Sequence, residues 1–135
     1  MLLLQLIAYA AITKTLIWNS SIWWHAFGVF ILSALIEAAR KCLPPNEETA
    51  YLDSYSSRLG IHGSAFVTFL LGCLSFYCFF LIGNIYALWL AISLIPLFVG
   101  CIRFSAKPNK MGRNLIQLGA VMSYISLNLI VWLCL

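Results

Sequence analysis

Long apolar stretches separated by short polar ones dominate this chain. Residues 59–102 contain no Lys, Arg, Asp or Glu. A helix of that length would measure roughly 66 Å, about two crossings of a bilayer core of about 30 Å. The pattern predicts an all-α membrane protein, a bundle of about five transmembrane helices that forms one domain over residues 1–135. The predicted spans are residues 2–18, 22–39, 60–82, 85–102 and 114–135.

Helix-breaking residues mark where these spans end. Pro44 and Pro45 stop the second span, and Gly83 with Asn84 predicts a tight turn between the third and fourth. Pro108 and Gly112 punctuate the connection before the last span. Two polar loops are therefore expected, at residues 40–59 and 103–113. The first apolar segment has no positively charged flank before it, which favours a membrane segment over a signal peptide.

Composition agrees with the membrane class. Hydrophobic residues make up 63% of the chain and charged residues 9%, whereas a soluble domain is about a quarter charged. The 5 cysteines are odd in number, form no CxxC motif and lie mostly in apolar spans, and only 2 histidines are present. These features favour small buried thiols over a zinc site or a disulfide framework. Membrane lipids are expected partners, and nucleic acid is not.

The basic residues are distributed unevenly between the two sides of the predicted bundle. Lys14 alone falls on one side, and all other basic residues fall on the side of the two long loops. This bias predicts that both loops are cytoplasmic, as in a multi-pass protein of a bacterial inner membrane. The basic residues of the loop side are Arg40, Lys41, Arg58, Arg103, Lys107, Lys110 and Arg113.

Amides and a phenol recur along the last predicted span. Asn114, Gln117, Tyr124 and Asn128 fall on one stripe of a helix. Because lipid offers amides no hydrogen-bond partner, we expect this stripe to face the other helices.

The most polar stretch of the chain runs from Glu37 to Arg58 and contains all 4 acidic residues. The spacing of Glu37, Arg40 and Lys41 places them on one helix face. Carboxylates beside a membrane can hold Mg²⁺, and Arg and Lys can bind phosphate oxygens. The same residues are equally compatible with a simple intrahelical ion pair, and with cations that set topology and contact anionic headgroups.

The order of residues in this stretch favours the metal and phosphate site over the other two interpretations. The string E-A-A-R-K-C-L-P-P-N-E-E-T-A-Y-L-D-S-Y-S-S-R-L-G, residues 37–60, resembles a variant found in the UbiA superfamily of intramembrane prenyltransferases. In that superfamily the sixth helix ends in E-x-x-R-K, and a Pro-Glu-rich loop, a T/S-Y-S element and a Gly that opens the seventh helix follow. The five predicted spans also resemble the family's fifth to ninth helices, half of a nine-helix bundle.

The resemblance implies a Mg²⁺-dependent transferase that moves a prenyl group from a prenyl diphosphate to an aromatic or lipid acceptor. It implies that Glu47, with Glu48 and Glu37, contributes to the metal site. It also implies that Arg40 and Lys41 touch diphosphate and that Tyr55 helps to close or orient the site. We further expect Arg113 or Lys110 of the neighbouring loop to line the same pocket. No residue of this chain is assigned to catalysis itself.

Two departures from the family pattern bear on activity. The usual second motif, D-x-x-x-D, is absent as such, and the first motif, N-D-x-x-D, does not occur in this sequence. The chain would then be the C-terminal half of a transferase, one wall of a site completed by a missing N-terminal half or a complementary membrane subunit. Activity of this half alone is not expected.

Two other functions are open from the residues. One is a non-enzymatic membrane accessory protein whose charged cytoplasmic loops bind a partner or lipid headgroups. The other is a small transporter that works as an oligomer. The absence of any carboxylate from the middle of a predicted span argues against a transporter, because coupling residues are expected there.

The charge asymmetry yields a prediction about topology. Single cysteines introduced at residues 41–58 and 103–113 should react with a membrane-impermeant thiol reagent only after the cytoplasmic face is opened, because basic loops stay on that side. Labelling of either loop from outside intact cells would contradict the orientation.

Overall fold

The computed structural model describes residues 20–47 and 54–133, and this part of the chain is helical without strands. It contains four α-helices and one short 3-10 turn, which confirms the all-α class. The first predicted span, residues 2–18, lies outside the described residues. The elements are α2 (Ser20–Lys41), η1 (Pro45–Glu47), α3 (Tyr55–Ile82), α4 (Asn84–Ala106) and α5 (Lys110–Leu133).

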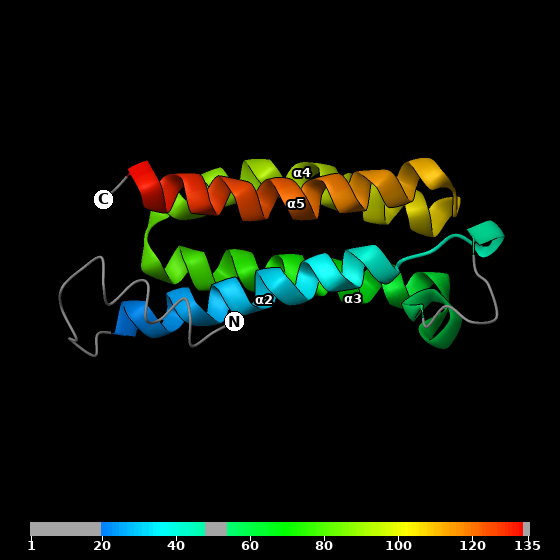
Figure 1. Cartoon of the computed structure of the whole chain (residues 1–135), viewed down its shortest axis with the longest axis horizontal. Coiled ribbons are helices and arrows are strands. Elements are labelled where there is room, and N and C mark those ends of the chain that lie inside the picture. Colours follow the sequence, from blue (N-terminus) through cyan, green and yellow to red (C-terminus); the bar gives the residue numbers. More distant parts are fainter. Residues whose placement is uncertain (1–19, 48–53, 134–135) are drawn as a thin grey trace.

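The α-helices pack in two layers (Figure 1). Helices α2 and α3 form one layer, and α4 and α5 form the other. Contacts between α3 and α4 and between α2 and α5 join the layers. One end of the bundle contains η1, the start of α3 and the connection between α4 and α5 (Figure 1). We call this end the polar end.

Two of the described helices have the length and hydropathy needed to span a membrane. Tyr55–Ile82 and Asn84–Ala106 are long and apolar enough to cross a bilayer. The structure thus gives this character to two helices and does not show the five crossings that the sequence pattern predicts.

The helix ends at the polar end differ from the predicted boundaries. The third helix begins at Tyr55 and kinks at Gly60, whose φ of 72° lies in the left-handed region that glycine adopts readily. The predicted loop 103–113 is short, because α4 continues to Ala106 and α5 begins at Lys110. The Asn109 side chain makes the early start possible, since its Oδ1 accepts a hydrogen bond from Gly112 N at 2.9 Å.

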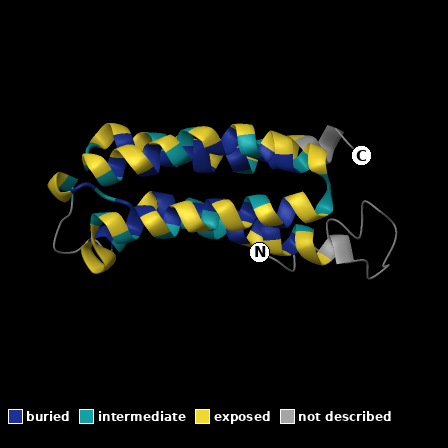
Figure 2. Ribbon diagram, turned by 180° about the vertical axis from the view of Figure 1, so that it is seen from behind, coloured by how far each residue is buried: buried dark blue, intermediate teal, exposed yellow. Residues whose placement is uncertain are grey.

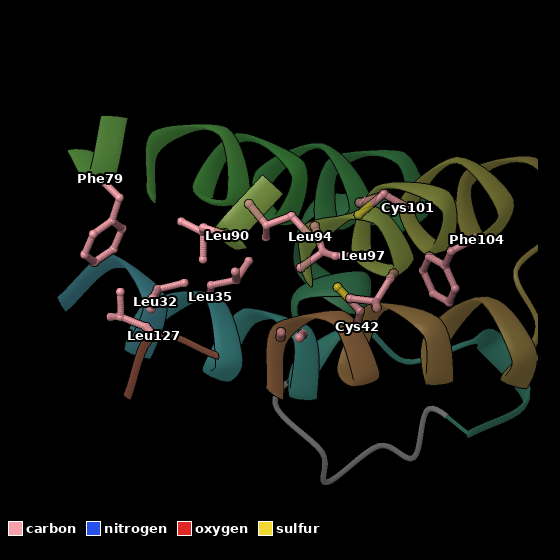
Figure 3. Close-up of a cluster of buried hydrophobic side chains, with 14 of the residues drawn as sticks. Leu32, Leu35, Cys42, Phe79, Leu90, Leu94, Leu97, Cys101, Phe104 and Leu127 are labelled. Atoms are coloured by element: carbon pink, nitrogen blue, oxygen red, sulfur yellow. The ribbon is translucent and has the colours of Figure 1, made fainter. Parts of the chain in front are cut away.

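A single apolar core runs between the layers. Side chains from each α-helix meet there, including Leu35 of α2, Phe79 of α3, Leu94 of α4 and Ile116 of α5. Figure 3 shows Leu32 and Leu35 opposite Leu90 and Leu94, with Phe104 near the polar end. Close packing of these side chains gives the helices van der Waals contact with one another.

Helices α4 and α5 approach each other most closely at three glycines. A Cβ added to Gly119 would lie 2.6 Å from Leu97 Cβ, and one added to Gly100 would lie 2.7 Å from Ile116 N. A Cβ on Gly112 would meet the Phe104 backbone at 3.0 Å. Small residues at a helix interface allow this backbone approach, which is a common packing mode in membranes.

Hydroxyl groups, rather than the predicted amide stripe, fill the polar positions of the α4–α5 interface. Ser93 donates to Ser123 at 3.3 Å, and Ser123 donates to Gly119 O at 2.7 Å. Asn128 is exposed, and its Nδ2 donates to Tyr124 O of the same helix at 2.7 Å. The prediction that the stripe faces other helices is therefore wrong for Asn114 and Asn128, which are exposed, whereas Tyr124 of the same stripe packs against the core. Asn128 needs no partner on another helix because its amide bonds its own backbone.

The glycine contacts generate a prediction about stability. Gly119→Ala should lower the free energy of unfolding by about 1–3 kcal/mol, because the added methyl meets the Leu97 backbone and forces the helices apart. The loss should exceed the gain in helix propensity of about 1 kcal/mol. Chemical unfolding in detergent micelles, followed by circular dichroism, measures the difference.

Gly83→Ala is the matched control. Gly83 has extended backbone angles, and a Cβ there would meet Tyr86 at an ordinary 3.4 Å. Its free energy of unfolding should stay close to that of the wild type. Equal stability of the two variants would show that the α4–α5 approach tolerates a methyl group.

Candidate functional site

The end of α2 carries the first charged group of the polar end. Glu37 accepts hydrogen bonds from Arg40 Nη2 at 2.9 Å and Nε at 3.1 Å, and its carboxylate lies 3.4 Å from Lys41 Nζ. The prediction that Glu37, Arg40 and Lys41 share one helix face is therefore confirmed. The side chains of Glu37 and Arg40 are well exposed, so water screens this pair and its contribution to stability is small.

Lys41 connects this group to the start of α3. Its Nζ lies 5.5 Å from the centre of the Tyr55 ring, within the range of a cation–π contact. The side chain of Lys41 is 30% exposed, less than that of Arg40 at 70%. Three residues that the resemblance assigns to diphosphate, Arg40, Lys41 and Tyr55, thus lie together.

The connection that leaves α2 is anchored at its base. Leu43 N donates to Ser56 Oγ at 2.8 Å. Cys42 Sγ lies 3.3 Å from Thr68 Oγ1, and burial raises the pKa of the Cys42 thiol. Ser54 caps α3 by accepting from Ser57 N at 3.1 Å. The serines of the S-Y-S element therefore hold the connection against α3, a structural role that the sequence did not reveal.

Farther along the connection, Glu47 at the end of η1 lies against α5. Glu47 forms an ion pair with Arg113 in the first turn of α5. The side chains are 29% and 23% exposed, so the pair is better shielded from water than Glu37 with Arg40. Arg113 Nε is buried and has no hydrogen-bond acceptor among the described residues. The acidic connection and the basic start of α5 therefore meet directly.

The predicted site residues fall into two groups at the polar end. Glu37, Arg40, Lys41 and Tyr55 form one group, and Glu47 with Arg113 forms the other. Ion pairs between described residues stay within each group. Lys110 is exposed in the first turn of α5. Glu48, the remaining predicted metal ligand, lies outside the described residues.

The described carboxylates do not by themselves fit Mg²⁺. Each of them, Glu37 and Glu47, is already neutralised by a cation. Residues 20–47 and 54–133 contain no cluster of three or more His, Cys, Asp or Glu that could hold a metal ion. The donor set fits an anion better, because guanidinium groups bind phosphate oxygens through paired hydrogen bonds. The assignment of metal ligands stays a prediction from the resemblance.

The different exposure of the two ion pairs generates a prediction. A double-mutant cycle of Glu47→Gln and Arg113→Gln should give a coupling free energy of about 1–2 kcal/mol, between the values for exposed and buried pairs. The control cycle of Glu37→Gln and Arg40→Gln should give a much smaller coupling. Unfolding in detergent of the wild type, the four single variants and the two double variants measures both couplings, and equal couplings would contradict the shielding of the Glu47–Arg113 pair.

Comparison of the chain with protein-family models, with curated proteins and with solved structures finds no match.

Proposed function

We propose that this chain forms one wall of a prenyl diphosphate site in an integral membrane protein, as the C-terminal half of a UbiA-like prenyltransferase. The observation that carries the proposal is the contact of Glu47 with Arg113. It joins the Pro-Glu-rich connection of the resemblance to the basic start of α5. The groups needed to hold a diphosphate therefore gather at one end of an apolar bundle.

The outer surface supports placement in a membrane. Figure 2 shows exposed residues along the outward faces of the helices. Large apolar side chains are prominent there, and a soluble monomer rarely exposes so continuous an apolar surface. Multi-pass insertion in a bacterial inner membrane, with the polar end in the cytoplasm, is part of the proposal. Examples from α3 and α4 are Phe66, Leu70, Tyr77, Phe80, Ile85, Leu88, Ile92, Ile95 and Ile102.

The chemistry of the polar end suits a diphosphate. Arg40 and Arg113 offer planar guanidinium groups that can bind two phosphate oxygens at once, and Lys41 and Lys110 offer point charges. The isoprenoid tail would lie against the apolar helices, which it resembles in polarity. The acceptor would be an aromatic or lipid molecule, as the resemblance implies.

Magnesium belongs to the completed site in this proposal. The N-D-x-x-D motif of the family would come from a second chain or from the rest of a longer protein. The described carboxylates are neutralised by cations, so this half alone should bind diphosphate weakly and without a metal requirement.

The proposal predicts which substitutions matter. With a membrane protein that carries the N-D-x-x-D motif supplied by co-expression, geranyl thiodiphosphate should bind in a Mg²⁺-dependent manner. Arg40→Ala and Arg113→Gln should each weaken binding roughly tenfold, the effect of losing one charge-assisted contact of about 1.4 kcal/mol. Isothermal titration calorimetry in nanodiscs measures the affinities.

Arg103→Ala is the matched control for this measurement. Arg103 is an exposed cation in the last turn of α4, at the same end of the bundle. Its replacement should leave the affinity nearly unchanged. If all three variants bind like the wild type, the cations of the polar end do not contact diphosphate and the transferase proposal fails.

A non-enzymatic accessory function is the second candidate. The pairing of both described carboxylates with cations favours it, because neither of these two groups is then free to bind a metal. In that case the chain should bind anionic vesicles of phosphatidylglycerol without Mg²⁺ and should ignore geranyl thiodiphosphate. Co-sedimentation with vesicles of phosphatidylglycerol, and of phosphatidylcholine as a control, distinguishes the two functions.

A further inference from the structure

We infer that Glu47 is a built-in competitor for the phosphate position on Arg113, so that a diphosphate binds by exchange with the Glu47 carboxylate. The inference rests on the proposed function, since it concerns the same site. It adds a regulatory role for η1: the turn keeps the strongest anion-binding group of α5 occupied until a ligand displaces it.

The first support is the ion pair itself. The Arg113 guanidinium, which could hold two phosphate oxygens, is engaged by a carboxylate of the same chain. Its Nε is buried without an acceptor among the described residues. The Glu47 carboxylate thus leaves one donor of the guanidinium unused. A phosphate group, with more acceptor oxygens than a carboxylate, can engage that donor as well.

The second support is how η1 is attached. At its base, Leu43 N bonds Ser56 Oγ at 2.8 Å, and Cys42 is buried against Thr68. At its tip, Pro45 and Asn46 are exposed. The turn is closed internally by a bond of 2.8 Å from Glu47 N to Pro44 O. The base can therefore stay fixed while the tip moves.

The ion pairs of Glu37 differ from that of Glu47 in the elements that they join. Glu37 belongs to the same helix as its partners, Arg40 and Lys41, so displacing it would free no segment. Glu47 and Arg113 come from different elements, and breaking their contact releases η1 from α5. Exchange at Arg113 would therefore couple ligand binding to the position of the acidic connection.

Competition of this kind predicts a gain on substitution. If Glu47 occupies Arg113 about nine-tenths of the time, its removal should raise the apparent affinity for an anion about tenfold. Glu47→Gln keeps the size of the side chain and removes its charge. In EDTA, the full-length Glu47→Gln chain in phosphatidylcholine nanodiscs should bind inorganic pyrophosphate about tenfold more tightly than the wild type.

Two further variants make the measurement specific. Asn84→Lys should bind like the wild type, because it makes the same change in net charge at the exposed start of α4, at the opposite end of the bundle. Adding Arg113→Gln to Glu47→Gln should abolish the gain. Hydrogen–deuterium exchange of the wild-type Asn46 and Glu47 amides should speed up when saturating pyrophosphate is added, since the displaced turn loses its contact with α5. This second readout needs no variant.

Equal or weaker pyrophosphate binding by Glu47→Gln, or no binding by either protein, would overturn the inference. An equal gain in Asn84→Lys would overturn it too, because the effect would then be one of net charge. Loss of the gain when phosphatidic acid is included in the nanodiscs would assign the exchange to a headgroup phosphate instead of a soluble diphosphate.

A different result would refute the proposed function. Its failure shows as absent geranyl thiodiphosphate binding in the completed complex, whatever pyrophosphate does on the chain alone. The reverse result, in which the complex binds geranyl thiodiphosphate but Glu47→Gln gives no gain in EDTA, overturns only the competition by Glu47.

Discussion

The close approach of α4 and α5 fixes the geometry on which the polar end depends. Gly100, Gly112 and Gly119 let the two backbones meet where any larger residue would collide. Because Gly112 packs on Phe104, the first turn of α5 is held against the last turns of α4. Arg113 follows directly, so its guanidinium is presented beside the connection that leaves α2. A helix pair packed less closely would not define this position.

The bundle separates its polar groups by position. On the outside, large apolar side chains cover α3 and α4. Within the interface, small hydroxyls such as Ser93 and Ser123 bond to each other and to backbone carbonyls. Charges gather at the polar end, where water or headgroups can solvate them. This division follows from the cost of an unpaired polar group in an apolar medium.

The charged side chains of the polar end form two sets of ion pairs, and cations outnumber carboxylates among the described residues there. Exposed Glu37 is matched by Arg40 and Lys41 of its own helix, and Glu47 is matched by Arg113 of another element. The second pair is the more consequential because it crosses between elements and is better shielded. It brings Glu47, from the connection that follows α2, into contact with α5.

The sequence by itself determined the helical class, the tight turn at Gly83 and the face that groups Glu37, Arg40 and Lys41. These features depend on local hydrophobicity and helix periodicity. Only the tertiary structure decided that Asn128 is exposed and that Ser56 anchors Leu43. It also decided that Glu47 meets Arg113. These contacts join residues distant in sequence, or depend on which of several partners an amide or hydroxyl finds, and local pattern carries no information about either.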